Sequence, residues 1–82
     1  MEFIAVHTPE FIEIGKRNPL AIAKFESYYK YYFYFTVAME NHIWRFAIGG
    51  DSSDIYRLNI GRETPLTDLL SCSIDFVDKS LP

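Results

Sequence analysis

Alternation between apolar and polar side chains is strongest in the aromatic run at residues 28–35. Between residues 25 and 39, one set of alternate positions is apolar or aromatic, and the other set is charged or amphipathic. A period of two is typical of a strand, and aromatic side chains favour strands. The pattern predicts one long strand over residues 28–39. Its odd-numbered aromatic side chains are expected to lie under a helix: Tyr29, Tyr31, Phe33 and Phe35.

Two shorter segments after this strand continue the alternation. Residues 40–42 form the expected turn, and residues 43–48 form the expected return strand, because their apolar side chains fall on alternate positions. Residues 49–54 are rich in residue types that favour turns. Residues 55–60 alternate again, and they are expected to complete a three-stranded meander.

The C-terminal part of the chain has the spacing of an amphipathic helix. Thr64 is the expected N-cap and Pro65 the first helical residue. Apolar residues then recur every three or four positions between residues 66 and 81. Three acidic residues fall on the opposite side of this helix: Asp68, Asp75 and Asp78. The pattern predicts a C-terminal helix that packs its leucines on a sheet.

The N-terminal third of the sequence is compatible with more than one interpretation. Residues 2–7 are expected to form a first strand. Thr8 and Pro9 could then start a short helix that ends at Gly15, or residues 8–10 could form a turn before a strand at residues 11–14. We favour the strand, because the helix would be short. Residues 20–26 fit two helical turns as well as a strand in phase with the aromatic run.

Together these elements predict an α+β fold for a single domain over residues 1–82. We expect a four- to five-stranded, mainly antiparallel sheet with a central three-stranded meander and a C-terminal amphipathic helix packed on one face. That helix would cover one face of the sheet. Little of the chain remains to cover the other face.

Composition restricts how such a small domain is stabilised. A chain of this length buries only about 60–65% of its unfolded surface. Cys72 is the only cysteine, which excludes an internal disulfide and favours a reducing compartment. Hydrophobic residues make up 49% of the chain, a high proportion that is compatible with a homodimer. No secretory signal is visible, and the longest uncharged run, residues 31–39, is too short to span a membrane. We therefore expect a cytoplasmic protein without a membrane partner.

Residue types that carry catalysis or bind metals stand in no recognisable motif. His7 and His42 have no visible nucleophile or orienting carboxylate, and Cys72 is expected to be a partly buried structural cysteine. Asp51 and Asp54 lie in a loop that lacks the ligand spacing of a calcium site. We therefore expect no catalytic residue, no metal and no cofactor, and a protein that is not an enzyme.

The even-numbered face of the predicted long strand is the best candidate for a binding surface. Tyrosine and tryptophan are enriched at the energetic centres of protein interfaces. The predicted partner-binding residues are Tyr28, Lys30, Tyr32, Tyr34, Trp44 and Arg45. The sequence thus favours a non-enzymatic protein-interaction module, such as a small inhibitor, an immunity protein or an adaptor, that occupies the surface of a partner protein.

Tyrosines interleaved with lysines would also suit single-stranded nucleic acid, because rings can stack on bases and lysines can neutralise phosphates. The net charge of −3 and the lack of a ribonucleoprotein-type motif disfavour this alternative.

Basic and acidic side chains are distributed unevenly along the chain. Residues 16–30 carry four basic side chains and one acidic side chain, whereas residues 63–82 carry four acidic and one basic. Opposite patches of this kind can pair within one molecule, between two copies or with a partner.

Overall fold

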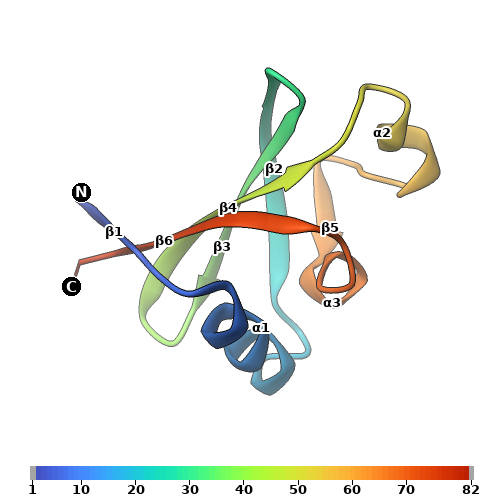
Figure 1. Ribbon diagram of the computed structural model, residues 1–82. Helices are drawn as coiled ribbons and strands as arrows, with labels where there is room; N and C mark the ends of the chain where they lie inside the picture. The colour runs from blue at the N-terminus through green and yellow to red at the C-terminus, as the bar shows by residue number, and fades with distance from the viewer. Residues whose placement is uncertain (1, 82) are drawn as a thin grey trace.

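The six strands within residues 2–81 join in one antiparallel sheet with the order β1-β6-β4-β3-β2-β5 (Figure 1). The computed structural model describes residues 2–81; Met1 and Pro82, the two ends of the expected domain, lie outside the described residues. The elements in chain order are β1 (Phe3–Ala5), α1 (Thr8–Arg17), β2 (Ile22–Tyr29), β3 (Tyr32–Met39), β4 (His42–Gly49), α2 (Asp54–Arg57), β5 (Glu63–Pro65), α3 (Leu66–Leu69) and β6 (Ile74–Ser80). The α+β class and the antiparallel sheet are confirmed, and the sheet is larger than expected.

Residues 8–17 form helix α1, so the helix is the correct one of the two alternatives left open for the segment after Thr8. Pro9 lies in its first turn, where a residue without an amide hydrogen loses no intrahelical bond. Phe11 and Ile14 are three positions apart and are buried on the same side of the helix. The strand that we favoured at residues 11–14 is therefore wrong. Residues 20–26 contribute to strand β2 instead of a helix.

The aromatic run folds back on itself instead of continuing as one strand. Strand β2 ends at Tyr29 and β3 begins at Tyr32, and these two residues pair across the hairpin. The turn residues Lys30 and Tyr31 have φ values of 50° and 69°. Tight hairpin turns need this left-handed conformation, which asparagine and glycine usually supply. The single strand over residues 28–39 is therefore wrong, because neither turn residue carries the usual turn signal.

A β-bulge in β2 changes which aromatic side chains face the core. The register with β3 shifts between Phe25 and Ser27, so that Phe25 and Tyr28 both pair with buried phenylalanines. The ring centroid of Tyr28 lies 4.5 Å from that of Phe33. The even-numbered Tyr28 thus belongs to the inner face. Tyr29, which we expected under a helix, is exposed.

The C-terminal segment departs most from the sequence interpretation. Only one turn, α3, is helical, and β6 inserts between β1 and β4. Ile74 and Val77 both face the core, at a spacing of three that a helix would also produce. In the strand this spacing arises from a register shift against β4 at Ala47 and Ile48. Pairing along both edges of β6 therefore overrides the local helical pattern, and the predicted helix over residues 66–81 is wrong.

Two shorter segments also differ from expectation. Residues 55–60 contain most of the one-turn helix α2 and a turn that leads to the buried Ile60, so the third strand of the expected meander is wrong. Asn59, with a φ of 53°, lies in this turn. Thr64 pairs with Ala23 in the sheet instead of capping a helix, and the N-cap of α3 is Pro65.

The core lies between the inner face of the sheet and the two helices α1 and α3, which lie side by side (Figure 1). The ring centroid of Phe11 in α1 lies 5.0 Å from that of Phe46 and 5.7 Å from that of Trp44. Gly15 lets α1 approach α3 closely, because a Cβ atom there would lie 3.1 Å from both methyl carbons of Leu70. The largest fully buried side chains are Trp44, Phe11, Phe33, Phe35, Phe46, Ile48, Leu66 and Leu69.

A small polar clamp joins the end of α1 to the turn between β3 and β4. Arg17 Nη2 donates to Glu40 Oε1 at 3.2 Å, and Asn18 Nδ2 donates to Glu40 Oε2 at 3.0 Å. The hydrogen bonds from Asn18 and Arg17 lower the pKa of Glu40 below its usual 4.5. A carboxyl group with a lowered pKa stabilises the folded state above its unfolded pKa, and this contribution is lost as the pH falls through the folded value.

We expect Glu40→Gln to reduce the free energy of unfolding at pH 7 and to have a smaller effect at pH 3, because the stabilisation from a lowered pKa declines as the pH falls below the unfolded pKa. Urea denaturation of both proteins at the two pH values measures the difference. An equal difference at pH 7 and pH 3 would show that the Glu40 carboxylate does not stabilise the fold through its charge.

Candidate functional site

The side of the sheet opposite the helices carries four large, partly exposed side chains around one small, buried residue, Ala47. We call this surface the open face; its residues are Tyr32, Tyr34, Arg45, Ala47 and Phe76. They lie on β3, β4 and β6, with the intervening side chains of β3 and β4 buried against the helices. Tyr32 is 38% exposed and Phe76 is 42% exposed, so each ring presents a substantial apolar surface to solvent. Accessible aromatic side chains that gather on one face can form an interaction surface.

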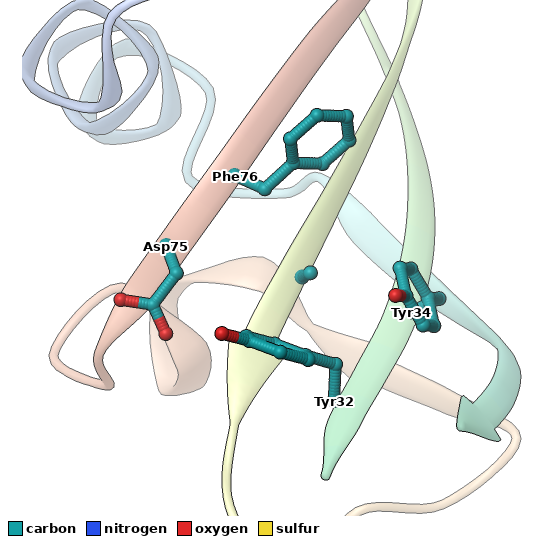
Figure 2. Close-up of a pocket in the computed structure, with 5 residues that line it drawn as sticks. Tyr32, Tyr34, Asp75 and Phe76 are labelled. Atoms are coloured by element: carbon teal, nitrogen blue, oxygen red, sulfur yellow. The ribbon is translucent and has the colours of Figure 1, made fainter. Parts of the chain in front are cut away.

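One part of the open face forms a hollow of about 320 Å³ (Figure 2). The aromatic hollow is lined by Tyr32, Tyr34, Ala47, Asp75 and Phe76. The register places Ala47 between Tyr34 on one neighbouring strand and Phe76 on the other. Ala47 is only 2% exposed although it lies on the open face, because the larger side chains around it shield it. The small side chain of Ala47 therefore forms the bottom of the hollow, and the larger aromatic side chains form its sides.

Asp75 supplies the charged group of the aromatic hollow. Figure 2 shows its carboxylate on the side of the hollow toward which the Tyr32 hydroxyl points. Gly49 leaves space for both groups: a Cβ atom there would lie 2.8 Å from Asp75 Oδ2 and 3.6 Å from Tyr32 Cε1. The only ion pairs among residues 2–81 involve Glu40 and Asp54, so the Asp75 carboxylate has no basic partner in the part of the chain that the structure describes.

Arg45 lies on the open face next to the hollow. Its guanidinium carbon is 4.4 Å from the centroid of the Phe3 ring, in cation–π contact with edge strand β1. Asp78 lies opposite Arg45 on β6, but the two side chains are not within ion-pair distance. The Nε atom of Arg45 is buried and has no hydrogen-bond partner among the described residues.

Three of the residues predicted to bind a partner come together on the open face: Tyr32, Tyr34 and Arg45. Lys30 lies in the exposed hairpin turn, where its ammonium nitrogen is 5.3 Å from the centroid of the Tyr29 ring. Its placement on a strand face is therefore wrong.

The other two predicted residues, Tyr28 and Trp44, belong to the inner face. The Tyr28 hydroxyl donates a hydrogen bond to the Gly50 carbonyl at 3.1 Å, and burial is the largest cause of its raised pKa. Trp44 is 1% exposed, and its indole N–H donates to the Met39 carbonyl at 3.1 Å. The expectation that both side chains share a surface with Tyr32 and Tyr34 is wrong. The bulge in β2 turns Tyr28 to the inner face. On β4, Trp44 alternates with the open-face residues Arg45 and Ala47 and therefore faces inward.

Sequence reasoning missed three residues of the hollow: Ala47, Asp75 and Phe76. We assigned Asp75 to the outer face of a helix and gave no role to Phe76. A strand signal was present, since Ile74, Phe76 and Val77 are strand-favouring types set between polar residues. The leucine spacing that precedes them concealed this signal.

Side chains with catalytic potential serve structural roles or stand apart. His42 Nδ1 lies 3.1 Å from the Ser80 carbonyl oxygen, whereas His7 is exposed at the start of α1. Cys72 is partly buried, as expected, and burial raises the pKa of its thiol. Asp51 accepts hydrogen bonds from Ser53 within its own loop. Within residues 2–81, no three side chains of histidine, cysteine, aspartate or glutamate gather as a metal site would require.

None of the helices between residues 2 and 81 has the length and apolar character needed to cross a membrane. Comparison of the chain with protein-family models, with curated proteins and with solved structures finds no match.

Proposed function

We propose that this protein is a non-enzymatic interaction module that occupies the surface of a partner protein through its open face. The observation that carries this proposal is the aromatic hollow, where Tyr32, Tyr34 and Phe76 remain accessible around the buried Ala47. Rigid aromatic side chains on a strand provide a large contact area at low entropic cost. Action as an inhibitor, an immunity protein or an adaptor requires such a surface and no chemistry.

Charge on this side of the sheet supports a protein partner over single-stranded nucleic acid. Lys24 and Arg45 are its basic residues, but Asp75 and Asp78 lie on the same side. Carboxylates beside the aromatic rings would repel phosphates, on which the affinity for nucleic acid depends. A labelled single-stranded oligonucleotide should therefore show no saturable binding at low salt. Saturable binding that weakens steeply with added salt would instead support the nucleic-acid alternative.

The double variant Tyr34→Ser/Phe76→Ser is expected to lose its partner while it keeps its fold. Both side chains are accessible on the open face, and loss of two aromatic contacts weakens a protein interface by about 2 kcal/mol or more, which is about 30-fold in Kd. Immobilised wild-type and variant proteins are compared for capture from a lysate of the native host, and the captured protein is then titrated against each.

Tyr56→Ser is the matched control, because Tyr56 is 88% exposed on α2 and does not line the hollow. A protein that binds the wild type and this control but not the double variant is the expected result. Equal capture by all three proteins would contradict the use of the open face. No specific capture by the wild type would contradict the proposed function.

A second copy of the chain is one protein that could occupy the open face. The molar mass from light scattering identifies this case, because a dimer should dissociate in Tyr34→Ser/Phe76→Ser and persist in Tyr56→Ser.

We further propose a cytoplasmic location, which is supported by the presence of only one cysteine.

A further inference from the structure

The partner group that fits the aromatic hollow can be named by its chemistry. We propose that the hollow receives an arginine side chain of the partner protein, with the guanidinium group between the aromatic rings and paired with the Asp75 carboxylate. This inference rests on the proposed function, because it specifies what the partner presents to the open face.

The walls of the hollow are suited to a flat cation. Tyr34 and Phe76 stand on the two strands that flank Ala47, and two strand spacings separate them by about 10 Å at the backbone. Tyr32 closes one side, with its ring centroid 6.4 Å from that of Tyr34 and the two rings tilted by 48°. Aromatic faces attract cations, and the planar guanidinium group also stacks on them.

Asp75 provides the charge complement to that cation. Its carboxylate is exposed, it lies at the hollow beside Tyr32, and its hydrogen bond within residues 2–81 is a long contact of 3.5 Å from Ser73 Oγ. A carboxylate can accept two parallel N–H bonds from guanidinium, which a lysine ammonium group cannot offer in the same plane. Arginine therefore satisfies the rings and the carboxylate together.

Arg45 does not fill this place itself. It is not among the residues that line the hollow, and its guanidinium group stacks on Phe3 of β1, the strand on the far side of β6. The positive charge of Arg45 thus lies outside the hollow, where Arg45 lines a neighbouring depression with Tyr34 and Phe76. Replacement of Arg45 by glutamine should leave the affinity for a cation unchanged or raise it, whereas a subsite for an anion would lose affinity.

The test is a titration of the ¹⁵N-labelled protein with acetyl-Gly-Arg-Gly-amide, followed by NMR. The expected result is a saturable shift of the amide signals around Ala47 and Phe76, with a Kd on the order of 1–10 mM. The same peptide with citrulline in place of arginine has nearly the same shape without the charge. It should bind at least about fivefold more weakly, and the lysine peptide should also bind more weakly than the arginine peptide.

Asp75→Asn should weaken binding of the arginine peptide about fivefold or more. Asp78→Asn is the matched control, because Asp78 is on the same strand and the same face but does not line the hollow; it should leave the Kd within about twofold. Equal binding of arginine and citrulline peptides, equal binding of the lysine peptide, or the absence of saturable shifts would each overturn the arginine subsite. None of these outcomes bears on capture of a partner protein, so the two proposals can fail separately.

Discussion

Replacement of Trp44 by alanine is expected to remove most of the stability of the fold at 25 °C. Trp44 is 1% exposed and packs against Phe11 of α1, and its indole N–H is bonded to a main-chain carbonyl. Truncation of a buried tryptophan costs about 3–5 kcal/mol, which is comparable to the whole stability of a small domain, about 5 kcal/mol. Circular dichroism and urea denaturation measure the loss.

Ile43→Ala is the control for this prediction, because Ile43 precedes Trp44 on the same strand, faces the opposite side of the sheet and is 37% exposed. It should cost about 1 kcal/mol or less. A Trp44→Ala protein that unfolds at the same urea concentration as the wild type would contradict the placement of Trp44 in the core. It would also restore the idea that Trp44 contacts a partner.

Tyr28→Ser is expected to destabilise the protein by about 2–3 kcal/mol. The substitution removes a ring that packs on Phe33, and it removes the hydroxyl that donates to the Gly50 carbonyl. That hydrogen bond ties the end of β2 to the segment after β4, so its loss should loosen the same end of the sheet. The free energy of unfolding from urea denaturation gives the effect, and Tyr28→Phe should recover most of the packing without the hydrogen bond.

The return strand could be predicted from the sequence because it obeys one simple alternation. Trp44, Phe46 and Ile48 are inward and Arg45 and Ala47 are outward, as a period of two requires. The same regularity in β3 correctly places Tyr32 and Tyr34 on the open face. An uncovered second face was also a correct expectation, because so short a chain has few elements left to cover it.

The errors arise where pairing in the folded sheet decides the local structure. The turn at Lys30 and Tyr31 contains no glycine or asparagine, so only the pairing of β2 with β3 reveals it. The bulge after Phe25 reverses the phase for Tyr28, and no single-residue signal marks it. Strand β6 shares the apolar spacing of a helix, and contacts with β1 and β4 decide between the two.

The candidate site is therefore only half visible in the sequence. Tyr32, Tyr34 and Arg45 lie on neighbouring strands of a hairpin that the alternation nearly defines. Asp75 and Phe76 come from a distant segment, and they reach the same surface only because β6 pairs with β4. The hollow and its carboxylate follow from this long-range pairing, which one sequence does not specify.

The central claim is that the aromatic run is divided between a core face and an open face. Urea denaturation of Tyr28→Ser and Tyr34→Ser tests it most directly, because the two substitutions are chemically identical and lie on paired strands. We expect a loss of about 2–3 kcal/mol for Tyr28→Ser and about 1 kcal/mol or less for Tyr34→Ser. Equal losses, or a larger loss for Tyr34→Ser, would contradict the division of the two faces.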